Sequence, residues 1–572
     1  MRRHSTLAAA IALAVASLFA GATGCGVDPG QQESDWSEVD TGIDPVSCPG
    51  GAPHLVDGRP ATWTVLHYSA GDNNLEQALV GDIDEMELGH QGSRNVNVVV
   101  QLDKESEPGR WRYHIQPDRT DGEIPSPVVE YSEVEPDSGD WRELSEFGRW
   151  GVTCYPAEHY VLIVSGHGGG WTSTDDAAIP IEQRARHARA RQHGESLRMI
   201  APDDTDHSEM YVDQLVEALG EIRAATRRPS DPDYLNRLVM YGSDACLMGT
   251  IEVAYDLRNA VTYLVASEQT EPNDGWPYNV LVRELSSRPS YYAVRPHLLA
   301  TTIVEAYGRS YAPGGAAKDE DKVTLAAIDT SALIRARNRV RKIAELLPQL
   351  MELDPELRAT MDEVREQSYS FGDDYTDLGR FLALLEQSML AAGKMPTVGQ
   401  TWDGDERWRT LRNAMDELMQ EIWPELVLGN VAGQYEGARG LSIFLPTDEC
   451  GWGLSTRDYA RSSFAEDSGW GALVQQLVGR QGGDYQEGYG RGRMYYQAFG
   501  QSFEAKLECH LRDGELSMYM LSWERTCNEE DPSCIPQLDL SLDIDVEHQQ
   551  VTEASMWCGK LGLQGAIRDV SL

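Results

Sequence analysis

Two short apolar runs, each followed by a reactive side chain, constrain the fold of this chain more than any other feature. Residues 160–165 lead through a glycine to His167, and residues 238–241 lead to Cys246. A continuous apolar run bounded by glycine is typical of a central strand that is covered on both faces. Ligands of open α/β sheets bind just beyond the carboxyl ends of such strands. Two neighbouring strands would therefore bring His167 and Cys246 together.

The segments around these runs alternate between strand-like and helix-like patterns. Residues 62–69, 95–102 and 261–267 are expected to be strands, and residues 208–224 and 247–258 are expected to be helices. This alternation predicts an α/β domain with a mostly parallel central sheet. Amphipathic patterns in the second half of the chain predict helical additions to that domain.

The ends of the chain differ from its centre. Residues 1–25 contain two arginines, an apolar run too short to cross a bilayer comfortably, and Cys25 in a context that resembles a bacterial lipobox. We expect an exported protein whose only membrane contact is a lipid anchor on Cys25; a secreted protein with an ordinary signal peptide is the alternative. The remaining parts are expected to be a polar tether (26–60), the main domain (61–478), a Gly-rich linker (479–500) and a small β-rich C-terminal module (501–572).

Composition excludes one class of partner. A formal net charge of −43 on 572 residues would repel phosphate backbones, so nucleic acid is not expected to bind. The nine cysteines do not have the spacing of a double Cys-x-x-Cys zinc site, and no metal site is predicted from them. If Cys25 is lipidated and Cys246 is a free nucleophile, an odd number remains, and the sequence does not fix which pairs form disulfides.

Cys246 and His167 have the chemistry of a nucleophile and its base. A cysteine reacts as the thiolate, and a helix beginning near Leu247 would lower the pKa of the Cys246 thiol through its dipole. Three glycines follow His167, which lets the backbone approach a ligand and present N–H groups to a developing oxyanion. Either residue alone would more often be structural, but their joint position at two strand ends favours a catalytic pair. No third catalytic residue is evident.

Several separated motifs resemble the clostripain family of cysteine peptidases. Ser-Gly-His-Gly occupies residues 165–168 and Asp-Ala-Cys occupies residues 244–246, and segments 68–75, 267–278 and 439–446 are also similar. The resemblance implies a caspase-like three-layer α/β sandwich. It implies an endopeptidase whose protein or peptide substrates carry arginine, or to a lesser degree lysine, at the P1 position.

The same resemblance assigns roles to individual residues. Cys246 matches the nucleophile and His167 matches the catalytic histidine, without a required cofactor. The backbone N–H groups of Gly168 and Cys246 would form the oxyanion hole. A basic P1 side chain calls for a carboxylate in the pocket. Asp244 is the first candidate, because its side chain leaves the strand on the same side as that of Cys246, and Asp274 is the second; either could instead cap a turn.

Two further properties of the family suggest regulatory segments. Self-cleavage after a basic residue between the catalytic strands would fall in an arginine-rich stretch, with candidates Arg184, Arg186, Arg189 and Arg191. Calcium activation is associated with clostripain, and acidic clusters that could bind the ion are Asp203-Asp204-Asp206 and Asp373-Asp374-Asp377. Neither cluster has the spacing of an EF-hand.

Two other functions fit part of the pattern. The segment 167–170 matches an oxyanion motif of some lipases, but no serine has glycine at both −2 and +2, so a serine esterase is disfavoured. A surface-anchored, catalytically inactive binding protein with a peptidase fold is the second alternative. The intact His167, Cys246 and Asp244 argue against it, and the sequence alone leaves it open.

Overall fold

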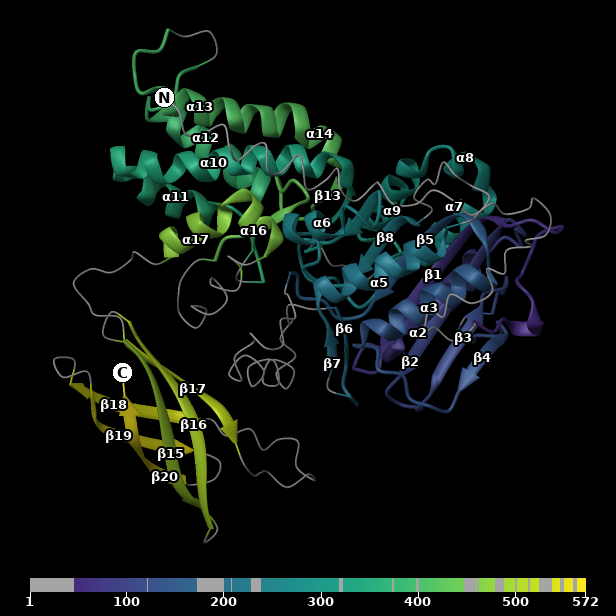
Figure 1. Cartoon of the computed structure of the whole chain (residues 1–572), viewed down its shortest axis with the longest axis horizontal. Helices are drawn as coiled ribbons and strands as arrows, with labels where there is room; N and C mark the ends of the chain where they lie inside the picture. Colours follow the sequence, from purple (N-terminus) through teal and green to yellow (C-terminus); the bar gives the residue numbers. More distant parts are fainter. Residues whose placement is uncertain are drawn as a thin grey trace, which may run out of the picture. The chain divides into compact units, whose positions relative to one another are not determined.

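The computed structural model describes residues 46–171 except 121, residues 200–227 except 207, and residues 238–446 except 318–321, 373–374 and 398–400, together with 459 and 462–478. Between residues 488 and 571 it describes the backbone of six strands (Figure 1). Cys25 and the arginines at 184, 186, 189 and 191 lie outside the described residues. Within those residues, no helix is long and apolar enough to cross a membrane.

A nine-stranded sheet forms the centre of the described main domain, in the order β13-β10-β9-β8-β5-β1-β2-β3-β4. Its five central strands, from β9 to β2, are parallel, and the outer strands on both sides pair antiparallel. The predicted mostly parallel central sheet is therefore confirmed. The strands are β1 (Ala61–Gly71), β2 (Val96–Lys104), β3 (Arg110–His114), β4 (Val128–Ser132), β5 (Ala157–Ser165), β8 (Leu238–Asp244), β9 (Tyr263–Ala266), β10 (Leu325–Asp329) and β13 (Val427–Val431).

Helices cover both faces of this sheet, which makes the domain three-layered. Trp63 and Val65 of β1 belong to one apolar core, and Leu66 and Tyr68 of the same strand belong to the other. Burial on both faces explains why the central strands are continuous apolar runs. The first core contains α2 (Glu76–Gly89), α7 (Tyr278–Ser287) and α9 (Pro296–Ser310), and the second contains α3 (Trp141–Cys154), α5 (Val212–Ala225), α6 (Ile251–Leu257) and α10 (Leu333–Leu353).

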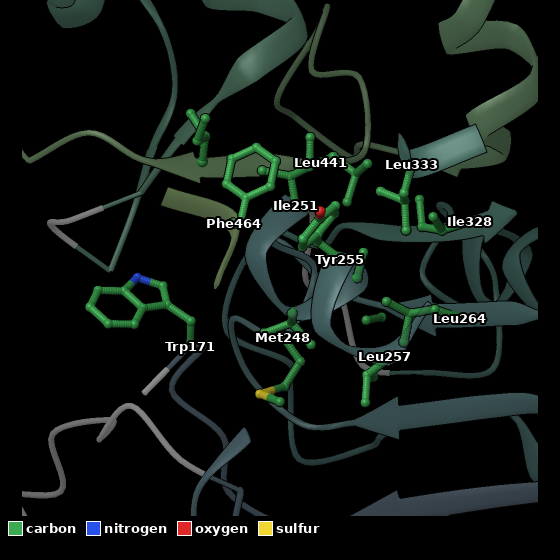
Figure 2. Packing of buried hydrophobic residues seen from close by; sticks show 14 of the residues in the cluster. Trp171, Met248, Ile251, Tyr255, Leu257, Leu264, Ile328, Leu333, Leu441 and Phe464 are labelled. Atoms are coloured by element: carbon green, nitrogen blue, oxygen red, sulfur yellow. The ribbon is translucent and has the colours of Figure 1, made fainter. Parts of the chain in front are cut away.

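The second core continues into the predicted helical additions. Figure 2 shows Ile251 and Tyr255 of α6 packed close to Leu333, Leu441 and Phe464, which come from later parts of the chain. Each fully buried side chain of this size contributes about 1.5–3 kcal/mol. The additions are α11 (Glu356–Gln367), α12 (Leu378–Ala391), α13 (Glu406–Asp416), α14 (Trp423–Leu426), α16 (Ser463–Ser468) and α17 (Trp470–Val478).

A small antiparallel sheet braces α6 from outside the main sheet. It consists of β11 (Ser370–Phe371), β12 (Tyr375–Asp377) and β14 (Ser442–Phe444). The N–H of Ser442 donates to the carbonyl of Gly249 (3.1 Å), and the N–H of Phe444 donates to the carboxylate of Glu252 in α6 (3.0 Å). The segment that follows Cys246 is thus held by residues far along the chain.

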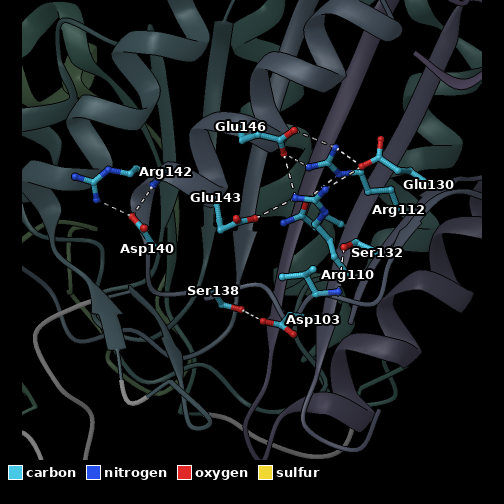
Figure 3. A network of polar contacts seen from close by, with 12 residues as sticks. Asp103, Arg110, Arg112, Glu130, Ser132, Ser138, Asp140, Arg142, Glu143 and Glu146 are labelled. Carbon is cyan, nitrogen blue, oxygen red and sulfur yellow. Dashed lines mark hydrogen bonds and ion pairs between the residues drawn. The ribbon is translucent and has the colours of Figure 1, made fainter. Parts of the chain in front are cut away.

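A buried arginine ties one edge of the main sheet to α3. Arg112 of β3 is fully buried, and it pairs with Glu130 of β4 (2.9 Å) and with Glu146 of α3 (Figure 3). Its guanidinium also donates to Gln101 (2.8 Å) and lies 4.6 Å from the ring centroid of Trp150. A buried cation needs such partners, because its desolvation is otherwise costly.

A separate six-stranded antiparallel sheet follows the main domain, in the order β17-β16-β15-β20-β19-β18. This sheet confirms the small all-β part of the predicted fold class. It begins at Gly488, inside the stretch 479–500 expected to be a linker, where glycine alternates with larger residues. The strands are β15 (Gly488–Ala498), β16 (Gln501–Arg512), β17 (Glu515–Trp523), β18 (Leu538–Asp545), β19 (Gln550–Cys558) and β20 (Leu563–Ser571).

One disulfide fastens the start of the described chain to the end of α3. Cys48 and Cys154 are bonded, with their Cα atoms 5.2 Å apart. The N–H of His54 donates to the carbonyl of Cys154 (2.7 Å), which adds a second tie between the same segments. Structural disulfides are typical of exported proteins.

Candidate active site

The two strand ends predicted to carry the reactive side chains are neighbours. Strands β5 and β8 pair in parallel, with Ser165 opposite Asp244. His167 and Cys246 each lie two residues beyond these partners, so they occupy equivalent positions at the same edge of the sheet. The N–H of Gly166 donates to the carbonyl of Asp244 (3.2 Å) and links the segments that follow β5 and β8 beyond the last paired residues.

Gly168 brings the backbone after His167 against the backbone of Cys246. A Cβ atom at Gly168 would lie 2.6 Å from the carbonyl oxygen of Cys246 and 3.1 Å from its nitrogen. Only glycine permits this approach, because real Cβ atoms do not come so close to backbone. The two residues expected to supply oxyanion-hole N–H groups are therefore adjacent.

Backbone hydrogen bonds from the segment after β9 hold the turn that carries Cys246. The N–H of Leu247 donates to Gln269 (3.2 Å), and the N–H of Gly249 donates to Ser267 (2.6 Å). Leu247 has φ of +63°, which is unusual for a residue other than glycine and costs about 1–3 kcal/mol. Strain of this kind persists only where the surrounding structure enforces it, and here it fixes the direction of the turn.

The expected effect of a helix on the Cys246 thiol is wrong. Helix α6 begins at Ile251, after the cap residue Thr250, and not near Leu247. A helix dipole acts within its first turn, so this later start weakens its influence on the sulfur. Burial raises the pKa of the thiol, and the nearby Asp244 raises it further, while the N–H of Glu271, 3.3 Å from Sγ, opposes the shift. Among the described residues, Cys246 is the free cysteine.

The imidazole of His167 has a partner that the sequence analysis missed. Its Nε2 lies 2.7 Å from Oδ1 of Asn74, which follows the end of β1, the other neighbour of β5. With the amide oxygen on the ring side, Nε2 carries the proton and Nδ1 keeps its lone pair. Burial lowers the pKa of His167, so the free imidazole is neutral at pH 7. The position of Asn74 just beyond a third central strand was the signal that could have revealed it.

We predict that replacing Asn74 by alanine lowers kcat roughly 100-fold and leaves KM nearly unchanged, because a misdirected imidazole loses catalytic geometry but no substrate contact. The acidic limb of the pH profile should also move, since the amide oxygen stabilises one tautomer of His167. Steady-state kinetics from pH 5 to 9 would show both effects. Asn95→Ala at an exposed position is the matched control, and an unchanged kcat and pH profile in Asn74→Ala would contradict the role.

Asp244 and Asp274 occupy different environments. Asp244 is buried beside the nucleophile turn, and its carboxylate accepts hydrogen bonds from the hydroxyl of Tyr278 (2.8 Å) and the N–H of Trp276 (3.4 Å). Burial raises its pKa. Asp274 is exposed and lines a pocket of about 640 Å³, together with Asp82 of α2.

A series of buried hydrogen bonds holds the side chain of Asp244. The hydroxyl of Ser165 lies 2.9 Å from both Nε2 of His67 and the hydroxyl of Tyr278, which in turn donates to Asp244. Burial lowers the pKa of His67 to about 3, so this histidine is a neutral hydrogen-bonding group. These hydrogen bonds fix the orientation of the Asp244 carboxyl group, and His67 serves as a structural partner and not as a base.

The acidic clusters expected to bind calcium are only partly brought together. Carboxylate oxygens of Asp203 and Asp206 lie within 4.8 Å of each other and of Asp137, while Asp204 gives a backbone N–H to the carbonyl of Asp72 (2.9 Å). In the second cluster, Asp373 and Asp374 lie outside the described residues. Asp377 is buried and accepts a hydrogen bond from the N–H of Arg380 (2.5 Å), so it caps α12.

Sequence comparison places the chain in a known class of protein. Residues 67–476 match the clostripain family, and the chain belongs to this family of cysteine peptidases. Clostripain of Hathewaya histolytica is 30% identical over 241 residues, which are 38% of this chain and 40% of that protein. The chain thus matches less than half the length of that relative.

Two solved structures are also similar. A secreted C11 cysteine protease from Bacteroides thetaiotaomicron, in complex with an irreversible peptide inhibitor, is 20% identical, with a TM-score of 0.47 over 72% of this chain and 99% of that one. An inactive zymogen C11 protease from Parabacteroides distasonis is 17% identical, with a TM-score of 0.46 over 72% and 98% of the two chains.

Proposed function

We propose that this protein is a cysteine endopeptidase in which Cys246 is the nucleophile and His167 is the general base and acid. The observation that carries the proposal is the register of β5 and β8, which places the two residues at matching positions beyond paired strands. Membership of the clostripain family supports the same reading.

The reaction would be acyl transfer through a thioester. His167 Nδ1 takes the thiol proton as Cys246 Sγ attacks the peptide carbonyl, and the N–H groups of Gly168 and Cys246 bind the oxyanion. His167 then gives the proton to the leaving amine, and water hydrolyses the thioester. The raised pKa of the thiol and the lowered pKa of the imidazole indicate that the free pair is neutral and that the ion pair forms during attack.

We also propose that the enzyme prefers arginine, and next lysine, at P1. The buried Asp244 beside the nucleophile supplies the negative charge that such a side chain requires. Hydrolysis of otherwise identical peptides with Arg, Lys, Asn or citrulline at P1 tests this proposal. We expect Arg to exceed Lys and both to exceed the neutral residues; equal rates would contradict it.

The arginine-rich stretch is proposed to be the site of self-cleavage. The segments that flank this stretch are joined at the candidate active site, since Gly168 pairs with Ile200 and the N–H of Ala201 donates to the carbonyl of His167 (3.1 Å). The candidates Arg184, Arg186, Arg189 and Arg191 lie between these ends.

We therefore expect the purified wild-type protein to separate into two chains under reducing, denaturing conditions, with the break after one of these arginines. A Cys246→Ala variant should remain a single chain, and substitution of the four arginines by alanine should slow the cleavage. Electrophoresis followed by N-terminal sequencing would show this. Two chains from purified Cys246→Ala would exclude self-cleavage.

We propose that calcium binds at a carboxylate cluster near the end of β1, which differs from the two clusters expected from the sequence. Oxygens of Asp72, Asp103 and Glu135 lie within 4.8 Å of one another. Within the described part of the chain, both carboxylate oxygens of Asp72 and one of Asp103 are buried without a hydrogen-bond partner. Oxygen ligands of this charge suit calcium. A bound cation would offset the negative charge next to the turn that presents Asn74 to His167.

Calcium should raise the melting temperature, and it should do so more at pH 8 than at pH 5.5. Burial raises the pKa of Asp103 to about 8, with the neighbouring carboxylates contributing. Protons therefore compete with the cation at low pH, and binding strengthens as pH rises. Thermal unfolding in calcium and in chelator measures the effect. Asp103→Asn should reduce it, exposed Asp403→Asn should not, and no calcium effect at either pH would exclude the site.

Export is supported by the Cys48–Cys154 disulfide. Lipid attachment at Cys25 stays a prediction, and the mass of the mature N-terminal peptide would test it. An unmodified N-terminus cleaved elsewhere would favour the secreted alternative.

A further inference from the structure

Glu271 lies between the nucleophile and the buried carboxyl group of Asp244. Its backbone N–H donates to Cys246 Sγ (3.3 Å), and its carboxylate accepts a hydrogen bond from the indole N–H of Trp276 (3.1 Å). The carboxyl groups of Glu271 and Asp244 lie close enough for a hydrogen bond to form between them once one of them is protonated. A hydrogen bond between two carboxyl groups requires a proton, because ionised carboxylates only accept.

The surroundings oppose ionisation of both carboxyl groups. Burial raises the pKa of Glu271 well above its usual range, and its interactions with Asp244 and Cys246 raise it further. Burial also raises the pKa of Asp244. The titratable groups around the pair are Asp82 of α2, Cys246 of the nucleophile turn, Tyr278 of α7 and Tyr307 of α9. Tyr311, just after α9, packs beside Tyr307. Asp274, Arg283 and Arg309 line the neighbouring pocket together with Asp82.

One polar atom beside the pair lacks a partner. Within the described residues, the hydroxyl of Tyr307 is buried without a hydrogen bond, and Glu271, Asp244 and Cys246 are among the groups that act on it. Buried hydroxyl groups normally have a partner in the functional state. An incoming guanidinium group offers N–H donors both to this oxygen and to the carboxylates.

We propose that Glu271 is a second acidic residue of the P1 pocket, and that a cationic P1 side chain displaces the proton shared by Glu271 and Asp244. The inference rests on the proposed function, since it concerns the specificity of the same site. The displaced proton passes to solvent, and the pocket changes from a singly charged acid pair to two carboxylates facing one cation. A neutral P1 side chain cannot offset the negative charge of a second ionised carboxylate, so the acid pair also lowers the affinity for substrates with neutral P1 residues.

Calorimetric titration with benzamidine, a small cationic mimic of an arginine side chain, tests the proton transfer. The Cys246→Ala background removes thiol ionisation, and buffers of different ionisation enthalpy reveal the protons released. We expect about one proton per bound ligand near pH 6, because binding favours the ionised pair. With Glu271→Gln added we expect none, because the amide of the introduced side chain can donate to Asp244 without ionising. Exposed Glu363→Gln is the matched control and should release the same proton as the parent.

Kinetics give an independent readout in the otherwise unaltered enzyme. Glu271→Gln should raise KM for an Arg peptide about 30-fold or more, as expected for removing one partner of a desolvated charge pair, with little change for a citrulline peptide. An equal rise in KM for the Arg and the citrulline peptides would overturn the inference. Absence of proton release on benzamidine binding to the Cys246→Ala parent would also overturn it, and that measurement does not depend on a Glu271 variant. If the wild-type enzyme cleaves no Arg peptide, the proposed function itself fails; if it cleaves Arg peptides without linked proton release, only this inference fails.

Discussion

Replacing Cys246 by alanine should reduce kcat/KM for Arg peptides by at least about 10³–10⁴-fold, because the covalent intermediate forms on its thiol. The raised pKa of the thiol means that the side chain is neutral in the free protein, so alanine removes little from folding stability. Steady-state hydrolysis and thermal unfolding of the purified variant measure the two quantities. We expect loss of activity with a melting temperature close to that of the wild type.

Two controls separate chemistry from folding in this comparison. Cys246→Ser keeps the size of the side chain but replaces the thiol by a much weaker nucleophile, and it should lose activity to a similar degree. The disulfide-bonded Cys48 and Cys154 are not available to substitute as nucleophiles. Retention of more than about a tenth of the wild-type rate by either Cys246 variant would exclude the proposed mechanism.

Replacing Asp244 by asparagine should lower kcat/KM for Arg peptides by roughly 10²–10³-fold, since a buried charge partner of the substrate is lost. Asparagine keeps an oxygen that can accept from the hydroxyl of Tyr278, so the local packing is preserved. Hydrolysis of a citrulline peptide should change little. Side-by-side kinetics with the two peptides measure the change in selectivity.

Asp274→Asn is the matched control for that substitution. Its carboxylate is exposed, where an ion pair is worth about 0.2–1 kcal/mol, so kcat/KM for Arg peptides should fall less than about fivefold. This contrast follows from burial alone, because both residues carry the same charge. An equal loss from both substitutions, or a loss in Asp244→Asn that is the same for Arg and citrulline peptides, would contradict the assignment of Asp244.

The central strands could be predicted because a strand that is buried on both faces has a continuous run of apolar residues. The runs that end before His167 and Cys246 are continuously apolar, and the two strands pair as neighbours, as expected. Gly168 permits a close backbone approach to Cys246, whereas the sequence predicted an approach to a ligand.

Features set by distant segments could not be predicted in the same way. The start of α6 at Ile251 depends on hydrogen bonds from Leu247 and Gly249 to residues after β9, and local helix propensity does not report them. Asn74 and Glu271 reach the site from other elements, so their roles became evident only once the sheet order was known. The raised pKa of Cys246 has the same origin, because the packing of remote residues determines its burial.

The most direct test of the central claim is covalent labelling with a peptidyl-arginyl chloromethyl ketone. Mass spectrometry of the digested protein should locate about one label per chain on Cys246, with loss of activity in proportion to labelling. Prior incubation with an arginine-containing substrate should slow the reaction. A label on any other residue, or full activity after Cys246 is labelled, would contradict the account.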